Sequence, residues 1–317
     1  MAVDVICLGL ACADVMVRPV EAFPPRGKLE LVPTLEIHLG GLAGVAAAVI
    51  AKLGGSVGFM GKLGNDGFGD YCAGALQRFG VNTDHLARSA DEGTPATVVL
   101  VGKDGERTFL HHPGCARTLR EGDVNTEKFR GAKHVHWGGP AVTPGLDGPP
   151  IARILERAKN MGLTTSVDTC YDGVDVWFPR IEAALPYLDV VMSSLEEARK
   201  YTGKRDPEAI ADFYLDRGPD IAVIKLGEDG MFVKSTVERL RVPAHKVEVV
   251  DTTGAGDAAC GAFVYGYTQG WELARSVQLA NAVGALTVQT MGGAEAVQSL
   301  EATLAFIERV PVKVEVV

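Results

Sequence analysis

The sequence predicts an α/β protein with a mostly parallel central sheet and a small β-sheet lid. From position 134 onward, short β-branched runs alternate with helical runs, a pattern typical of a parallel sheet covered on both faces. Before that point, two stretches of alternating residues are typical of half-buried hairpins. With 317 residues, of which 47% are hydrophobic, the chain can bury a large core.

The first part of the chain mixes buried and half-buried elements. Val3–Leu8, apolar apart from Asp4, indicates a buried strand, and the small residues after Gly41 indicate a closely packed helix. Alternation at 15–18 and 29–38, around a turn rich in Pro and Gly, predicts a hairpin. A strand is expected at 56–60 and a helix at 69–79.

A second hairpin is expected at 96–101 and 107–112, because Asp104-Gly105 between alternating runs is a good hairpin signal. Beyond it, strands are expected at 134–137, 164–168, 190–192 and 221–225, and helices at 150–161, 181–185, 195–202 and 206–217. Two inserted hairpins can pair over the C-terminal edge of the main sheet, where ligands bind; the alternative is surface decoration. We assign residues 13–38 and 94–116 to a β lid, and residues 1–12, 39–93 and 117–317 to the main α/β domain.

Composition excludes several classes of protein. The net charge of −9 argues against nucleic acid or an anionic membrane as a partner. No run approaches the roughly 18 apolar residues that span a bilayer, so we expect a soluble protein. The six scattered cysteines indicate reduced thiols in a cytoplasmic enzyme, and Cys12 lies near a buried first strand rather than in a signal peptide. His134 and His136 share a strand face and leave a zinc site open, without an evident third ligand.

The most informative segment is Asp251-Thr252-Thr253-Gly254-Ala255-Gly256-Asp257, between an expected strand at 247–250 and an apolar helix. Its small residues let backbone amides face outward at the positive end of the helix dipole, which binds phosphate. The carboxylate of Asp257 can then deprotonate a hydroxyl that attacks a phosphoryl group. The alternative is that Asp257 only complements the dipole. Asp251 suits either a cation site or a turn that accepts its own N–H groups.

Five motifs, in chain order, resemble those of the ribokinase-like (PfkB) carbohydrate kinases and together span essentially the whole chain. The segment 251–257 resembles the C-terminal signature of that family. The other four are Gly9-Leu10-Ala11-Cys12-Ala13-Asp14, Gly40-Gly41 with the small-residue run 43–48, the G-x-x-G-x-D-x-x-G stretch at 61–69, and Lys225-Leu226-Gly227-Glu228-Asp229-Gly230.

The resemblance implies a three-layer α/β/α ribokinase-like fold with a β-sheet lid through which family members often form homodimers. It implies an ATP- and Mg²⁺-dependent kinase that phosphorylates a hydroxymethyl group of a sugar or sugar derivative, with K⁺ as a further cation. The catalytic positions would be Asp257 as base and Gly254, Ala255 and Gly256 as anion hole. The substrate-binding positions would be Asp14, Gly40, Gly41 and Val45. The nucleotide-binding positions would be Lys225, Gly227, Gly230, Asn281 and Ser194, and the metal-binding positions Glu197, Asp251, Thr253, Thr287, Thr290 and Gly292.

Three of these positions have structural alternatives. Asp14 can cap the turn after the first strand, and Lys225 can be a strand-end lysine in solvent. Asn281 lies in the apolar helical stretch 277–288 and can be a satisfied core amide.

The chain departs from the family pattern mainly on the substrate side. Val45 stands where an Asn commonly contacts the substrate, and Ser194 replaces the Asn of N-x-x-E while Glu197 is retained. Residues 114–117 replace G-A-N-A, and an acidic residue expected near 138–139 is absent. These departures argue against ribose and favour a less hydroxylated, larger or anionic acceptor. The lid offers three cations for an anionic group: Arg107, Arg117 and Lys28.

Other functions stay open at this point. A nucleoside kinase of the same fold would need an aromatic surface for the base, for which Phe109 and Trp137 are the candidates. A sugar- or nucleotide-binding regulator is suggested by Val45 and Ser194, although a retained Asp257 argues against it. A dinucleotide oxidoreductase is disfavoured, because no G-x-G-x-x-G turn follows an early strand.

Overall fold

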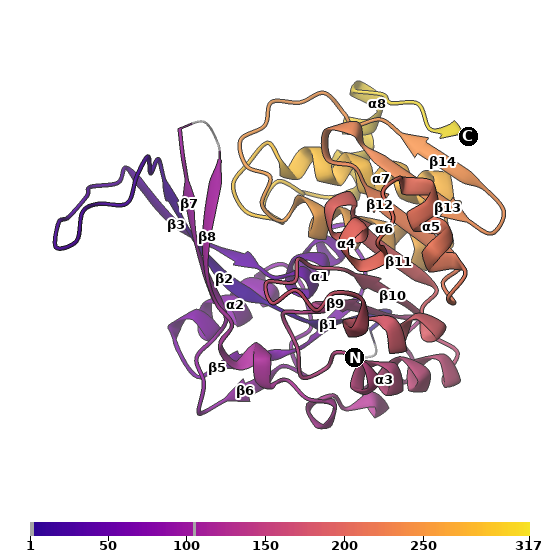
Figure 1. Ribbon diagram of the computed structural model, residues 1–317, viewed down its shortest axis with the longest axis horizontal. Coiled ribbons are helices and arrows are strands. Elements are labelled where there is room, and N and C mark those ends of the chain that lie inside the picture. The colour runs from indigo at the N-terminus through magenta and orange to yellow at the C-terminus, as the bar shows by residue number, and fades with distance from the viewer. Residues whose placement is uncertain (1–2, 104–105) are drawn as a thin grey trace.

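Helices sandwich a nine-stranded sheet, and a smaller sheet projects from one side of this body (Figure 1). The computed structural model describes residues 3–103 and 106–317. The pairs from β4 to β12 are parallel, whereas β13 to β15 extend the sheet in antiparallel fashion. The strands, in spatial order, are β15 (Glu315–Val316), β14 (Arg239–Val242), β13 (Met231–Ser235), β12 (Ile221–Lys225), β11 (Val190–Ser194), β10 (Thr164–Asp168), β9 (His134–Gly138), β1 (Val5–Gly9) and β4 (Val57–Met60).

Two hydrophobic cores lie on the two faces of this sheet, as expected for parallel strands that are apolar in both directions. One face carries α1 (Leu42–Lys52), α6 (Ala255–Thr268) and α7 (Leu273–Thr287), with α2 (Gly67–Arg78) and α8 (Leu300–Arg309) packed beside them. The other face carries α3 (Pro149–Asn160), α4 (Leu195–Thr202) and α5 (Pro207–Leu215). Small residues bring α1 and α6 together: a Cβ on Gly261 would lie 2.6 Å from the carbonyl oxygen of Ala46.

Several sequence predictions were wrong in detail. Residues 29–33 are not a strand, and 181–185 is not an α-helix, since Glu182–Tyr187 forms a 3₁₀-helix that contains Pro186. Residues 247–250 form no strand either. The N–H groups of Val250 and Asp251 donate instead to the carbonyl of Val288, at 2.7 and 3.1 Å. Strands β13, β14 and β15 were not predicted.

The two hairpins pair into one four-stranded sheet, so they are not separate surface decorations. Its order is β3 (Thr34–Gly40), β2 (Cys12–Arg18), β7 (Ala96–Val101) and β8 (Arg107–His112), with β2 and β7 parallel. Figure 1 shows this lid extending away from the main body, at the far side from the C-terminus. A short two-stranded sheet, β5 (Lys62–Gly64) with β6 (Ala87–Ser89), lies near its base.

The two faces of the lid differ in character because successive residues of a strand point to opposite sides. On the inner face, Met16, Val99 and Val101 are buried and pack with Met291 of the main domain. The outer face is aliphatic and half-buried or exposed: cross-strand register aligns Val15, Val17, Leu35, Ile37, Val98, Leu100 and Leu110. Within residues 3–103 and 106–317, no helix is both long and apolar enough to cross a membrane.

Candidate active site

The turn at 251–256 leads into α6 at the C-terminal edge of the sheet. Gly254 is the N-cap residue and has a φ of +73°, in the left-handed region that favours glycine. An added Cβ there would lie 2.6 Å from the Cα of Gly293, so the turn also needs glycine for space. Gly254, Ala255 and Gly256 are partly exposed, although the N–H of Ala255 donates at 3.3 Å to the carbonyl of Thr252. The first N–H groups of a helix lack intrahelical partners, so this end of α6 suits an anion.

A cavity of about 1250 Å³ opens in front of this turn. Its wall includes the predicted nucleotide-binding residues Ser194, Lys225, Gly227, Gly230 and Asn281, the predicted metal ligand Glu197 and the predicted catalytic residues Ala255, Gly256 and Asp257. Gly230 has a φ of +89°, and an added Cβ would lie 1.9 Å from the carbonyl oxygen of Val242. The Asn281 amide donates to the carbonyl of Pro243 at 2.8 Å. Asn281 is therefore both a satisfied buried amide and part of the cavity wall.

Asp257 lies in the first turn of α6 and faces this cavity. Burial raises the pKa of its carboxyl from 3.8 to about 7, and the negative charges of Asp168 and Glu197 act in the same direction. The ammonium of Lys225 opposes them. A carboxyl with such a pKa can take up and release a proton near neutral pH.

Lys225, at the end of β12, reaches under the turn. Its Nζ lies 2.7 Å from Oδ1 of Asp168, at the end of β10, and 3.4 Å from Sγ of Cys260 in α6. A Cβ added to Gly256 would lie 3.1 Å from the same Nζ. The side chain is 13% exposed, which excludes a lysine that merely extends into solvent. Burial is the largest influence and opposes its charge, but the negative neighbours Asp168, Cys260, Glu197 and Asp257 together raise the pKa of Lys225.

Ser194 and Glu197 form a capping box at the start of α4. The hydroxyl of Ser194 accepts from the N–H of Glu197, and Oε2 of Glu197 accepts from the N–H of Ser194 at 3.2 Å. The hydroxyl of Thr169 also donates to Oε2 of Glu197, at 3.0 Å. Burial raises the pKa of Glu197. Because one carboxylate oxygen accepts both bonds, the helix cap leaves the other oxygen available to the cavity.

Asp14 lies in the middle of β2, on the inner face of the lid, and does not cap a turn. Its Oδ1 accepts from the thiol of Cys12 at 3.3 Å. Burial raises the pKa of Asp14 from 3.8 to about 6. The carboxylate lies against Gly40, where an added Cβ would be 2.0 Å from Oδ2. Gly41, with a φ of +87°, backs onto the carbonyl of Leu10 and begins α1.

The predicted cation positions fall on two neighbouring loops. Oδ1 of Asp251 accepts from the N–H and the hydroxyl of Thr253, at 3.0 and 2.7 Å, as in a self-bonded turn. Among the described residues, Oδ2 of Asp251 is buried without a hydrogen-bond partner. On the second loop, the carbonyl of Thr287 accepts from the N–H of Thr290 at 3.3 Å, and Gly292 has a φ of +87°. Arg107 of the lid closes over the first loop, donating to the Thr253 hydroxyl at 3.1 Å.

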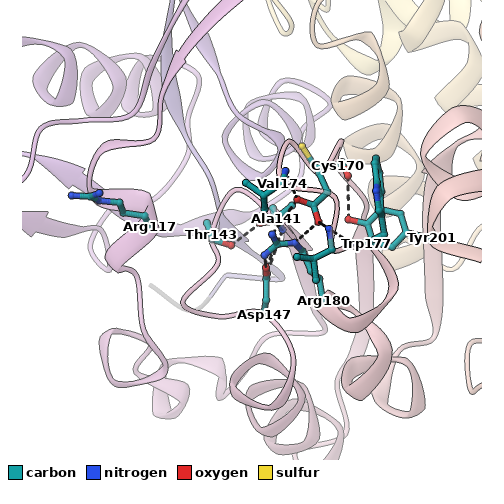
Figure 2. Close-up of polar contacts among 12 residues, drawn as sticks. Arg117, Ala141, Thr143, Asp147, Cys170, Val174, Trp177, Arg180 and Tyr201 are labelled. Atoms are coloured by element: carbon teal, nitrogen blue, oxygen red, sulfur yellow. Dashed lines mark hydrogen bonds and ion pairs between the residues drawn. The ribbon is translucent and has the colours of Figure 1, made fainter.

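The loop at 169–180, after β10, is held by several hydrogen bonds, and its first residues line the cavity. Figure 2 shows Arg180 beside Asp147, where Nη1 and Oδ2 lie 2.7 Å apart. The same guanidinium bonds to Asp172, whose carboxylate also accepts from the N–H groups of Val174, Val176 and Trp177. The hydroxyl of Tyr201 donates to the carbonyl of Cys170 at 3.1 Å (Figure 2). Cys170 lines the cavity, so these bonds fix part of its wall.

Several other candidates lie outside the cavity wall. Val45 is buried in α1, with its methyl groups against Gly293, so it supports the turn from below. Trp137 is fully buried in the core on the α3 side and offers no surface to a nucleoside base, whereas Phe109 is exposed on the lid. Arg117 lies apart from the Arg180 network and pairs with Glu92 (Figure 2). Lys28 is exposed.

Sequence reasoning missed Asp168, Cys170 and Cys260. Asp168 carried a usable signal, because it ends an expected parallel strand at the edge where ligands bind. The two cysteines carried none, since their relevance depends on which helices and loops pack together. The histidines at 134 and 136 bond to hydroxyl groups of β10. Across residues 3–103 and 106–317 there is no cluster of three His, Cys, Asp or Glu side chains placed to hold a metal.

An α/β/α fold with a turn that suits an anion and a half-exposed acid beside it is typical of a small-molecule phosphotransferase. The chain belongs to the pfkB family of carbohydrate kinases, whose model it matches over residues 3–300. It is 29% identical over 294 residues to the 2-dehydro-3-deoxygluconokinase of Bacillus subtilis (strain 168). The aligned region covers 89% of this chain and 90% of that protein. It is 31% identical over 269 residues to fructokinase-1 of Oryza sativa subsp. japonica, with coverage of 80% and 83%.

The fold has a close match among solved structures. A candidate ribokinase II from E. coli, in complex with ATP and Mg²⁺, superposes with a TM-score of 0.86 at 24% sequence identity. The match covers 97% of this chain and 99% of that one. The predicted ribokinase-like fold is therefore confirmed, and the chain is a carbohydrate kinase.

Proposed function

We propose that this protein is an ATP-dependent kinase that transfers the γ-phosphoryl group to a hydroxymethyl group of a sugar or sugar derivative. The observation that carries the proposal is the position of Asp257, which follows the turn at 254–256 and faces the cavity. Its pKa, raised to about 7 by burial and by neighbouring carboxylates, suits a group that accepts a proton from an alcohol.

The residues around the turn have different roles in phosphoryl transfer. Asp257 orients the acceptor hydroxyl and takes its proton, while the amides of Gly254, Ala255 and Gly256 stabilise negative charge on the transferring oxygens. Asp14 accepts hydrogen bonds from acceptor hydroxyls, and Gly40 and Gly41 let the acceptor approach the backbone. Lys225, held beside Gly256 by Asp168, adds positive charge at the same place.

The cavity fits ATP in size and in chemistry. Its wall of Ser194, Gly227, Gly230 and Asn281 lies beside the start of α6, so a base and ribose can lie there while the phosphates reach the turn. Mg²⁺ also fits, because Glu197 lines the cavity and its helix cap uses only one carboxylate oxygen. Burial raises the pKa of this carboxyl, and a divalent cation would lower it. Glu197 would hold Mg²⁺, and the ion would supply positive charge that offsets the charge of the phosphates.

A monovalent cation such as K⁺ has a place between the two loops that carry Asp251, Thr253, Thr287, Thr290 and Gly292. The supporting observation is Oδ2 of Asp251, which is buried and has no hydrogen-bond partner in the part of the chain that the structure describes. A cation there would be held by backbone carbonyls and by this oxygen. It would stabilise the turn that presents the anion hole.

A sugar is favoured over a nucleoside as the acceptor. Of the two aromatic residues that could stack on a base, Trp137 is buried in the core and only Phe109 is exposed. Arg107 bonds to Thr253 and lies 3.8 Å from Asp251, so an anionic group on the acceptor would have to displace those contacts. The intact geometry around Asp257 also favours a working kinase over a binding regulator.

We further propose a homodimer formed through the lid, in the cytoplasm. The aliphatic outer face of the lid, from Leu35 on β3 to Leu110 on β8, would be covered by the same face of a second copy. β3 and β8 are the outer strands of the lid sheet, where a second copy could pair. All six cysteines are free thiols, which suits a reducing compartment.

The test is a phosphate-transfer screen with ATP and Mg²⁺ against neutral sugars, keto-deoxy sugar acids and nucleosides, with products resolved by mass. Formation of a sugar monophosphate supports the proposal. Turnover of nucleosides without turnover of any sugar would contradict it. ATP binding without transfer to any acceptor would support the binding regulator instead.

A further inference from the structure

A short loop between α7 and α8 packs against the turn at 254–256. We call residues 291–295 of this loop the bracing segment. A Cβ added to Gly254 would lie 2.6 Å from the Cα of Gly293, so the backbones of the turn and of the bracing segment are in contact. The bracing segment is neither helix nor strand, so its shape depends on contacts with other elements.

Helix α1 contacts the bracing segment through two of its side chains. A Cβ added to Gly293 would lie 3.0 and 3.1 Å from the two methyl carbons of Val45. Seven residues later, the ammonium of Lys52 donates to the carbonyl of Ala294 at 2.7 Å and to that of Glu295 at 3.2 Å. Residues seven apart lie on the same face of a helix, so one face of α1 supports the segment at both places.

Lys52 is not an ordinary surface lysine. Its side chain is half-buried, and its Nζ lies 4.9 Å from the centre of the Phe79 ring. Burial lowers the pKa of Lys52, and the negative charge of Glu295 acts in the opposite direction. An ammonium that has lost part of its water needs other hydrogen-bond acceptors, and the two main-chain carbonyls supply them. The charge is therefore kept where it holds the main chain of the bracing segment.

The lid also contacts the bracing segment, but through side chains at its two ends. Nδ1 of His38 on β3 lies 3.4 Å from Oε1 of Glu295, and Nη1 of Arg18 on β2 lies 3.2 Å from Sδ of Met291. These contacts reach the side chains of residues 291 and 295. Lys52, in contrast, bonds to the main chain of Ala294, the residue next to Gly293.

We propose that Lys52 is a positioning residue for the turn at 254–256: its ammonium fixes the carbonyls of the bracing segment, and Gly293 of that segment fixes Gly254. This inference rests on the proposed function, in which the amides of the turn bind phosphate. Lys52 is not among the described residues that line the cavity, so it acts through the main chain and not on the nucleotide itself. Without its ammonium, the turn would sample orientations in which its N–H groups no longer converge on one anion.

The first test needs no ligand. Hydrogen exchange followed by mass spectrometry compares wild type with Lys52→Met, whose side chain has a similar length but neither charge nor donor. We expect exchange to be about tenfold faster in peptides that cover 291–295 and also in peptides that cover 251–257. Faster exchange at 291–295 alone, or at neither segment, would overturn the inference, because the turn would then not depend on Lys52.

The second test separates the phosphates of ATP from its base and ribose. Equilibrium titration at fixed Mg²⁺ and K⁺ concentrations gives Kd for ATP and for adenosine, which has no phosphate to contact the turn. Lys52→Met should bind ATP about tenfold more weakly, the effect of one lost hydrogen bond to a charged group, while Kd for adenosine stays within twofold. Lys52→Arg, whose guanidinium can donate to both carbonyls, should recover most of the affinity for ATP. Equal losses for ATP and adenosine would overturn the inference.

A matched control separates positioning from stability. Lys62 on β5 is also half-buried and also donates to a main-chain carbonyl, that of Thr118 at 3.1 Å, as well as to Asp123 at 3.0 Å. Lys62→Met should lower Tm but change neither the exchange at 251–257 nor the affinity for ATP. Equal losses of ATP affinity in Lys62→Met and Lys52→Met would overturn the inference and leave the kinase proposal intact. A wild-type protein that binds no ATP would refute the kinase proposal instead.

Discussion

In the proposed mechanism, the residues that would bind phosphate and those that would bind the acceptor are built in different ways. At the proposed phosphate end, one continuous segment, 251–257, would supply the cap, the amides and the base, and Lys225 reaches the turn from β12. At the acceptor end, Asp14, Gly41 and Arg107 come from three elements of the lid and of α1. The reaction chemistry is thus encoded locally, whereas acceptor selectivity depends on how distant segments assemble. Substitutions at the two ends should therefore fail in different ways.

The largest effect is expected at Lys225. Lys225→Met leaves the carboxylate of Asp168 buried without its ion-pair partner, which should cost about 3–5 kcal/mol of unfolding free energy. It also removes the charge beside Gly256, so kcat should fall by a hundredfold or more. Lys234→Met on β13 is the control, since its partners Glu208 and Asp212 are exposed. A Lys225→Met enzyme with kcat within threefold of wild type would contradict the phosphate-end account.

The next effect is a failure of phosphate binding. Gly254→Ala forces a φ of +73° on a residue with a Cβ and crowds Gly293, at a cost of about 1–3 kcal/mol. Calorimetric titration should show nucleotide affinity at least tenfold weaker, because the amides no longer share one orientation. The control is Gly67→Ala at the start of α2, where an added Cβ meets nothing within 4 Å. Equal nucleotide affinity in both variants would show that the turn does not bind phosphate.

The acceptor end should respond in KM rather than in nucleotide affinity. Asp14→Asn keeps the size of the side chain but weakens its hydrogen bonds to hydroxyls, so KM for the acceptor should rise about tenfold. The Kd for nucleotide, measured separately, should stay within a factor of two. A variant that loses nucleotide affinity while retaining its acceptor KM would reverse the assignment of the two ends.

A smaller effect is the pH dependence of the wild-type enzyme. Asp257 acts as a base only when ionised, and its pKa in the free protein is raised to about 7. The value of kcat/KM should therefore fall as pH drops below 7, approaching a tenfold loss per pH unit. Initial rates from pH 5.5 to pH 8.5 check this. A flat profile down to pH 5.5 would mean that no group with such a pKa takes part.

The smallest effect concerns stability. Folding raises the pKa of Asp257 from 3.8 to about 7. The contribution of this group to folding stability is therefore fully present below pH 3.8 and is lost as pH rises through about 7. Asp257→Asn removes this cost, so at pH 8 its Tm should exceed that of wild type by roughly 2 °C. The difference should shrink at pH 5.5. A lower Tm for the variant at pH 8 would contradict the assigned direction of the pKa shift.

Features encoded in one local segment could be predicted from the sequence, whereas features assembled from distant segments could not. The turn, the helix α6 and the parallel strands β9 to β12 could be located because their signals are local: glycines, β-branched runs and helical periodicity. The antiparallel strands β13 to β15 were missed, since Arg239–Val242 and Glu315–Val316 are short and become strands only by pairing at the sheet edge. At 247–250 the β-branched composition suggested a strand, but the N–H groups of Val250 and Asp251 donate to the carbonyl of Val288 instead.

The candidate site shows the same limit. Asp257 and Gly254 were found from the motif, and Lys225 from its strand end. Asp168, the partner of Lys225, was not found, because it is 57 residues away in the sequence. The two residues meet only because β10 and β12 flank β11 in the sheet. The role of Val45 could not be judged either, since its burial against Gly293 depends on how α1 packs under the turn.

Single-turnover transfer in Asp257→Asn, with bound ATP measured in the same samples, tests the central claim most directly. We predict that ATP binds with an affinity within threefold of wild type. Transfer to the best acceptor should be more than a hundredfold slower, within the range of about 10²–10⁴ contributed by a general base. Transfer within a few-fold of the wild-type rate would contradict the account, because the acid beside the turn would then not be the base.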